Sequence, residues 1–190
     1  MQKTLFRSIL ILCVVVFSLT TSAESAEKTF TFPNGISFNY PSEYQALESV
    51  IDNDMHIVNL MSRSSDSWIM TWGVMLWENQ EELTKMLQSP EEFKEAIEAM
   101  QGLGEAFEND LELKRLMGNT TVVQEKITVA GKEAFLMEMI MSGEVNVFKR
   151  TVMVPLPGNN IIYVVSTAFD RSKIDECRAV GVRIENSLKF

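Results

Sequence analysis

Alternation of apolar and polar residues predicts that most of this chain forms β-strands. The strand-like segments show a repeat of two residues, and turn residues separate them. The predicted strands are residues 28–32, 36–40, 55–62, 67–78, 120–129, 133–141, 145–155 and 161–168. Residues 42–49 show no clear repeat, and they fit either a short helical turn or an irregular crossing. The pattern is typical of a domain built around one sheet.

The C-terminal block, residues 132–190, organises this prediction. Tight turns join its three strands, and a helix at 171–188 follows them. Short turns connect antiparallel neighbours, so we expect a meander. The strand at 67–78 is apolar on both faces, which indicates a central strand covered on both sides. Earlier segments are expected to complete the same sheet, beginning with a hairpin at Asn34-Gly35, where both residues accept a positive φ.

Repeats of three and four residues predict the helices. One helix is expected at 80–87 after Asn79, and a second begins at Ser89-Pro90 and carries an apolar stripe over 93–111. Gly102 and Gly104 predict a kink or break in that second helix. The stripe of the last helix contains Ile174, Cys177, Gly181, Ile184 and Leu188.

Together these elements predict an α+β fold. We expect an antiparallel β-sheet covered by helices on both faces, which is an α/β/α sandwich. No internal repeat or linker divides the sequence, so one domain is expected from residue 27 to 190. The length is sufficient for a single sizeable core.

The first 26 residues follow the pattern of a cleaved signal peptide. Lys3 and Arg7 precede an apolar run at 8–19, and small polar residues follow it. The run is shorter than the roughly 20 residues that a membrane span needs. Cleavage is expected after Ala23 or Ala26, with no stable membrane insertion afterwards. The protein is therefore expected to be periplasmic or secreted.

Charge limits the partners of the exported chain. The net charge is −9, and removal of residues 1–23, with Lys3 and Arg7, changes it to −11. A field of this sign repels nucleic acid and anionic lipid, whereas it tolerates a basic partner or divalent cations. The acidic stretch 78–98 fits solvated helix faces, and it also fits a surface for a cation or a basic partner.

Residues for catalysis or metal binding are scarce. His56 is the one histidine, and Cys177 is the one cysteine left after removal of the signal that contains Cys13. A zinc site or a histidine-dependent triad needs more partners than these. No phosphate-binding loop, nucleophile elbow or dinucleotide motif is present. We therefore predict a protein that is not an enzyme, and we assign no catalytic, cofactor-binding or metal residue and no cofactor.

Sulfur-containing side chains leave alternatives open. Met137, Met139 and Met141 share one face of a strand, where their thioethers could hold Cu(I) or fill an irregular core. Cys177 lies on an apolar stripe, which favours a buried thiol over one that pairs with another chain. His56 lies beside apolar residues, which favours a structural or surface role.

Three stretches resemble a known family. Residues 32–41 read FPNGISFNYP, residues 127–135 read ITVAGKEAF, and the chain closes with IENSLKF at 184–190. In this order, and over most of the chain, they resemble the PsbP/DcrB-like exported proteins, which share an α/β/α sandwich with the Mog nuclear-import accessory proteins. The resemblance implies a Mog/PsbP-like fold and a non-enzymatic accessory or binding role.

Three functional hypotheses follow. The first is an exported protein that binds another protein, as yet unidentified, or forms part of an envelope complex. The alternative is a carrier of a small apolar ligand, held between helix 93–111 and the sheet in a pocket lined by methionine and aromatic residues. Trp68, Trp72 and Trp77 could line such a pocket or pack in the core. The third is a hydrolase that uses carboxylates alone, which requires two acids close together in a cleft.

Overall fold

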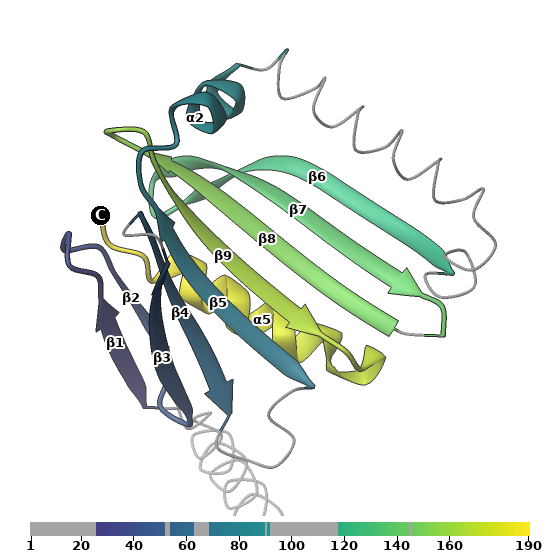
Figure 1. The fold of residues 1–190 in the computed structure, drawn as a ribbon. Coiled ribbons are helices and arrows are strands. Elements are labelled where there is room, and N and C mark those ends of the chain that lie inside the picture. The colour runs from purple at the N-terminus through teal and green to yellow at the C-terminus, as the bar shows by residue number, and fades with distance from the viewer. Residues whose placement is uncertain (1–25, 52–53, 63–68, 90, 92–117, 145) are drawn as a thin grey trace, which may run out of the picture.

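A seven-stranded antiparallel sheet forms the centre of the structure (Figure 1). This computed structural model describes residues 26–51, 54–62, 69–89, 91, 118–144 and 146–190. The strand order across the sheet is β3-β4-β5-β9-β8-β7-β6. The strands are β3 (Tyr44–Ile51), β4 (Met55–Ser62), β5 (Met70–Trp77), β6 (Asn119–Val129), β7 (Lys132–Ser142), β8 (Asn146–Leu156) and β9 (Asn160–Ala168).

The strands β6 to β9 form the predicted meander. Each pairs with the next in antiparallel register, and tight turns join β6 to β7 and β8 to β9. Those turns place Ala130, Gly131, Gly158 and Asn159 at positive φ. The strand β5 pairs with β4 on one side and β9 on the other, so its predicted central position is confirmed.

The N-terminal hairpin stands apart from the large sheet, contrary to expectation. Its strands β1 (Glu27–Thr31) and β2 (Ser37–Pro41) pair only with each other within the described part of the chain. In the turn, Gly35 has φ +90°, whereas Asn34 is not among the residues at positive φ. The hairpin joins the C-terminus instead, because Ser37 pairs with Lys189 and the Asn39 amide donates to Ser187 Oγ at 2.7 Å.

The expectation for residues 42–49 was also wrong. Residues 44–49 of this segment belong to β3, which pairs with β4 from Tyr44↔Ser62 to Ile51↔Met55. Tyr44 is buried, but most of the later side chains of the strand are exposed. An edge strand of this kind has few core contacts, so its apolar repeat is weak.

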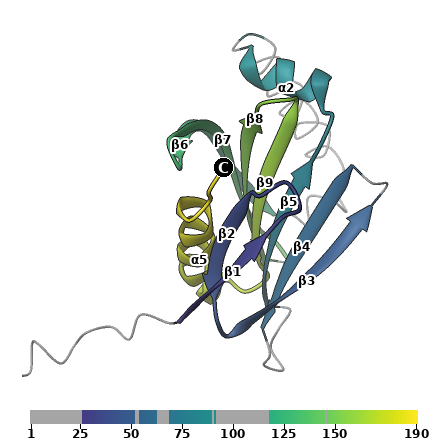
Figure 2. The same cartoon turned by 90° about the vertical axis from the view of Figure 1, so that its left-hand side faces the viewer.

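One face of the sheet, called here the first face, is covered by α5 (Ile174–Asn186) and the hairpin. Figure 2 shows α5 and β2 side by side. A short 3₁₀ turn, η1 (Arg171–Lys173), precedes the helix, and Asp170 accepts a hydrogen bond from the Ser172 amide at 2.8 Å. Cys177, Gly181 and Ile184 are buried against the sheet, as their stripe predicted.

The opposite face, called here the second face, carries α2 (Glu81–Gln88) at one end. Leu87 packs with Phe135 and Ile161. The helix begins after Gln80, which makes no side-chain cap hydrogen bond, and the expected cap, Asn79, lies one residue earlier with φ +59°. Glu81 and Glu82 are exposed, as expected for a solvated helix face.

The described residues therefore form an α+β fold with α5 along the first face and α2 at the end of the second. Helix 93–111 and its predicted break at Gly102 and Gly104 lie outside the described residues. Coverage of both faces by helices thus stays a prediction.

Candidate functional site

A network of buried charges joins α5 to the first face. Arg150 of β8 donates two hydrogen bonds of 2.9 Å to the Glu185 carboxylate on α5. Arg178 of α5 donates two to Glu138 of β7, at 2.8 and 3.1 Å. Arg150 also lies 3.5 Å from Glu138, which links the two pairs.

This network favours the charged form of Glu138. Burial by itself favours the protonated form of Glu138, but hydrogen bonds and charges from Arg178 and then Arg150 outweigh it and lower the pKa of the carboxyl. The Glu185 hydrogen bonds raise the pKa of Arg150 against the effect of burial. Both carboxylates are occupied by guanidinium groups, so the arrangement holds α5 in place and presents no free acid for the carboxylate-only hydrolase hypothesis.

His56 lies in β4 under the hairpin, with its side chain 16% exposed. The edge of its ring faces Phe32, with the ring centroids 6.5 Å apart. Its Nδ1 is 3.5 Å from a Glu48 oxygen, a contact that does not meet hydrogen-bond geometry. Within the described residues, no group of three histidine, cysteine or acidic side chains could hold a metal ion. The surroundings of His56 are those of a structural side chain.

Cys177 is buried where α5 meets β5. Its backbone carbonyl accepts a hydrogen bond of 3.0 Å from the Trp72 indole. Burial raises the pKa of the thiol to about 12, with a smaller contribution from Glu176. A thiol of this kind is mostly protonated and shielded, so the predicted buried role fits better than pairing with another chain.

The three methionines predicted to share a face lie on the second face. Cross-strand pairing places Met139 between Val122 of β6 and Lys149 of β8. Met137 lies beside Thr151, and Met141 beside Val147. Lys149 is exposed and its positive charge would repel a cation beside Met139. Met153 lies on the same face, diagonal to Met137, and packs against Phe135. These neighbours favour the packing role over a copper site.

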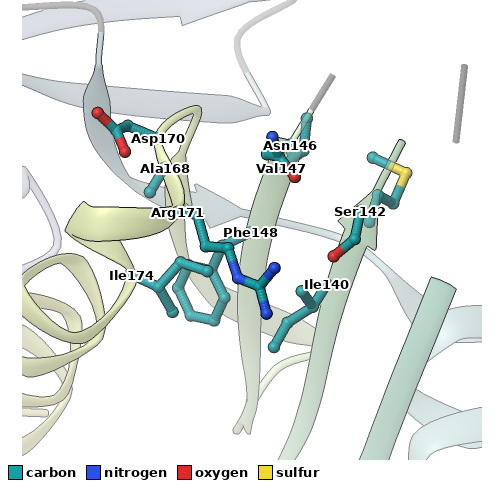
Figure 3. A pocket seen from close by; sticks show the side chains of 10 residues that line it. Ile140, Ser142, Asn146, Val147, Phe148, Ala168, Asp170, Arg171 and Ile174 are labelled. Carbon is teal, nitrogen blue, oxygen red and sulfur yellow. The ribbon is translucent and has the colours of Figure 1, made fainter. Parts of the chain in front are cut away.

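A shallow hollow lies where β7 and β8 meet the start of α5. Ile140, Phe148 and Ile174 form its walls, and the Arg171 side chain extends across it (Figure 3). It is open to solvent and encloses no space for a water molecule. Ligand pockets are usually roughly 300–1,000 Å³. The hollow therefore does not supply the site that the ligand-carrier alternative requires.

The proposed wall of that ligand pocket is only partly described. Trp72 is buried in the core, while Trp77 is half-buried on the second face beside Tyr163, with ring centroids 6.1 Å apart. Trp68 and the facing helix 93–111 lie outside the described residues. The ligand carrier thus stays an alternative prediction.

An exposed apolar surface lies at the β3 edge of the sheet. We call it the β3–β4 corner, and it consists of Leu47, Val50, Ile51 and Met61. Their exposed fractions run from 41% for Met61 to 52% for Val50. These four make up half of the large hydrophobic side chains that are exposed in the described part of the chain. Single exposed apolar residues are ordinary, but a cluster of them marks an interaction site.

The corner presents apolar side chains on both faces of one edge strand. Side chains alternate along β3, so Leu47 and Ile51 lie on the second face and Val50 on the first. The register places Met61 opposite Gln45, which puts it on the same face as Leu47. Within the described residues, no strand pairs with the outer side of β3.

Acidic side chains frame this corner. Glu43 precedes the strand, Glu48 lies within it, and Asp54 follows it, and all three are exposed. Lys28 reaches only the beginning, where its Nζ donates to the Ser42 carbonyl oxygen at 2.7 Å and lies 3.4 Å from that of Tyr44. The surface is therefore apolar along the strand and negative around it.

Sequence analysis missed this corner. It assigned no strand to residues 42–49, and exposure at a sheet edge is not visible in a sequence. One usable signal was the position of Leu47, Val50 and Ile51 in an acidic stretch. If this stretch is a strand, these three residues place apolar side chains on both of its faces.

No helix among the described residues is long and apolar enough to cross a membrane.

Comparisons with known proteins give weak structural likenesses. No protein-family model and no curated protein matches the sequence. The structure is similar to that of cyanobacterial PsbP (CyanoP) from Synechocystis sp. PCC 6803, with 10% identity and a TM-score of 0.48 over 89% of this chain and 95% of that one. It is similar to the Ran-binding protein Mog1p of Saccharomyces cerevisiae, with 12% identity and a TM-score of 0.48 over 87% and 96%.

A third similar structure is LpqN of Mycobacterium tuberculosis, described as involved in cell envelope biogenesis. The identity is 15% and the TM-score 0.43, over 86% of this chain and 90% of that one. The three structures share the PsbP/Mog1 fold. Residues 32–41 and 127–135 resemble sequences of proteins with this fold.

Proposed function

We propose that this protein is an exported, non-enzymatic accessory factor that binds another protein through the β3–β4 corner. The observation that carries the proposal is the exposure of Leu47, Val50, Ile51 and Met61 together at one edge of the sheet. Burial of such side chains by a partner contributes roughly 25 cal/mol per Å² of apolar surface.

Two further features support this assignment. The carboxylates shielded in the structure are bound by arginines, and the buried thiol is protonated, so these groups serve stability. The N-terminal residues carry the signal-peptide pattern, which leads to the periplasm or the exterior of the cell. A partner would accordingly be another envelope or exported protein.

Site-specific photo-crosslinking in the host tests the binding surface. A photoreactive amino acid replaces Leu47 in one strain, and in the control strain it replaces Ala179, which is exposed on α5 at the first face. We expect a discrete adduct of higher mass from position 47 and none from position 179. Absence of an adduct at 47, or equal adducts at both positions, would contradict the proposal.

The mass of the protein recovered from the host tests export separately. Cleavage is expected after Ala23 or Ala26, and the protein is expected in the periplasmic or extracellular fraction. Recovery of the uncleaved chain in the cytoplasm would overturn the exported location, whatever the crosslinking shows.

A further inference from the structure

We infer that the partner binds by adding an extended strand to the outer edge of β3, and that this strand carries apolar residues on one side and basic residues on the other. The inference rests on the proposed function and specifies its mode and its partner chemistry. In this mode, main-chain hydrogen bonds supply affinity and alternate side chains supply specificity.

The composition of β3 favours strand addition. Soluble proteins protect edge strands with lysine, proline, bulges or short length. The eight residues of β3 contain neither lysine nor proline, and they pair with β4 in unbroken register. Apolar residues on both faces are typical of a strand with neighbours on both sides. The strand β3 thus combines apolar residues on both faces with an edge position that lacks lysine and proline.

The backbone of β3 offers the hydrogen-bonding groups. In an antiparallel pair, alternate residues direct their N–H and C=O groups away from the partner strand. Lys28 lies against the carbonyl groups at Ser42 and Tyr44, so the stretch that has no outer partner among the described residues begins after Tyr44. Seven residues remain from there to Ile51, which is enough for an ordinary strand.

The side chains of β3 define what the added strand must carry. Leu47 and Ile51 lie on the second face, where an added strand would place apolar residues opposite them. On the first face Glu48 lies between Ala46 and Val50, and its side chain is 40% exposed. A lysine or arginine opposite Glu48 would form an ion pair with it. Glu43, Asp54 and the net charge of −9 also attract a basic strand.

The second edge of the sheet provides an internal comparison. The strand β6 also exposes two apolar side chains, Val122 and Val123. Its charges are balanced, because Glu125 is followed by Lys126, which forms an ion pair of 2.9 Å with Glu133. A basic apolar strand therefore has no electrostatic preference for β6, whereas it is attracted to β3.

A designed peptide tests the inference with the purified protein. The probe is an eight-residue peptide that alternates valine and lysine, and the readout is amide hydrogen exchange measured by NMR. We expect at saturation a slowing of roughly tenfold or more at alternate amides of β3, because those amides gain hydrogen bonds. A valine–glutamate peptide, and the same valine–lysine peptide methylated on alternate backbone nitrogens, are expected to produce no slowing.

Matched variants place the interaction on the strand. Glu48→Lys should weaken peptide binding roughly fivefold to tenfold, because it replaces attraction with repulsion directly opposite a lysine. Glu125→Lys makes the same change on β6 and should leave binding unchanged. Val50→Pro keeps the charge and is expected to abolish binding, because residue 50 shares the outward direction of the Tyr44 carbonyl and proline removes its backbone donor.

The outcomes separate the two proposals. Protection at β6, equal binding of the methylated peptide, or no protection anywhere would overturn strand addition at β3. If position 47 still forms a discrete adduct in the host, protein binding at the corner stands while its mode is wrong. If position 47 forms no adduct, the proposed function itself fails, whatever the peptide does.

Discussion

Arg150 places a positive charge below the surface of the protein, and Glu185 neutralises it. The Arg150 residue is 8% exposed and Glu185 is 2% exposed. A buried pair of this kind is not a large source of stability by itself, since both ions lose their hydration. Its loss is costly, however, because the remaining partner is left as a buried, unpaired charge.

Removal of one partner should therefore be strongly destabilising. We expect Arg150→Met to lower the free energy of unfolding by about 3–5 kcal/mol, measured by urea denaturation. The double variant Arg150→Met/Glu185→Leu should regain much of this loss. Glu133→Gln removes the exposed partner of Lys126 and should change stability by less than about 0.5 kcal/mol. A small effect of Arg150→Met alone would show that the pair does not hold α5.

Glu138 should contribute to the acid sensitivity of the fold. Burial alone would raise its pKa, but Arg178 and Arg150 outweigh burial and lower the pKa in the folded protein from the ordinary value of 4.5. Its stabilising effect is therefore complete above that value, which holds in the unfolded chain, and is lost as the pH falls through the folded pKa. We expect Glu138→Gln to flatten the decline of unfolding free energy below about pH 4.5. Glu125→Gln, on the exposed edge strand, should leave the decline unchanged.

At the scale of elements, Gly181 sets how closely α5 approaches the sheet. A Cβ atom at this position would overlap Ser166 Oγ and lie 3.2 Å from Ser166 Cβ. Both residues are buried, so a larger side chain would have to push the helix away from β9. The same close approach brings Arg150 and Glu185 together. The packing of α5 on β9 and the Arg150–Glu185 ion pair therefore both depend on the distance between the helix and the sheet.

A larger side chain at position 181 should push α5 away from the sheet. We expect Gly181→Leu to lower the unfolding free energy by about 3 kcal/mol through overpacking. Ala179→Leu, on the exposed side of the same helix, should change it by less than about 0.5 kcal/mol. Thermal unfolding followed by circular dichroism measures both, and similar midpoints for the two variants would contradict close packing at Gly181.

Elements with a strong repeat could be predicted from the sequence. The meander of β6 to β9, the central strand β5 and the buried stripe of α5 follow from periodicity and turn residues. The strand β3 could not be predicted, because its later side chains lack core contacts and so show no clean alternation. The hairpin itself was predicted, but its position outside the large sheet was not. That position depends on the pairing of Ser37 with Lys189, which are far apart in the chain.

The chemistry of the candidate site was only partly accessible. The burial of Cys177 followed from its stripe, but the Arg150–Glu185 pair joins residues 35 positions apart and has no local signature. The β3–β4 corner is defined by exposure, which depends on strand order across the sheet. Exposure of this kind becomes visible only when the sheet is assembled.

At the scale of the whole molecule, stability should increase from the edges of the sheet to its centre. The central strands β5 and β9 each have two neighbours and bury residues such as Val74 and Val164 completely. We expect their amides to exchange at least roughly 100-fold more slowly than those of β3 and β6, which open locally. Hydrogen exchange of the unliganded protein measures this difference. Equal rates in β3 and β9 would contradict an open edge at β3.

The order in which strands join the sheet differs from the order in which they are synthesised. The strand β9, which connects the half formed by β3, β4 and β5 to the half formed by β6, β7 and β8, is the last strand of the chain. The N-terminal hairpin also reaches its final position only after the C-terminus has been synthesised, because Ser37 pairs with Lys189. Until β9 has been synthesised, each half of the sheet has only three of its strands and no strand that connects it to the other half. A nascent chain of this design is expected to complete its fold late, because the two halves of the sheet are joined only when β9 has been made.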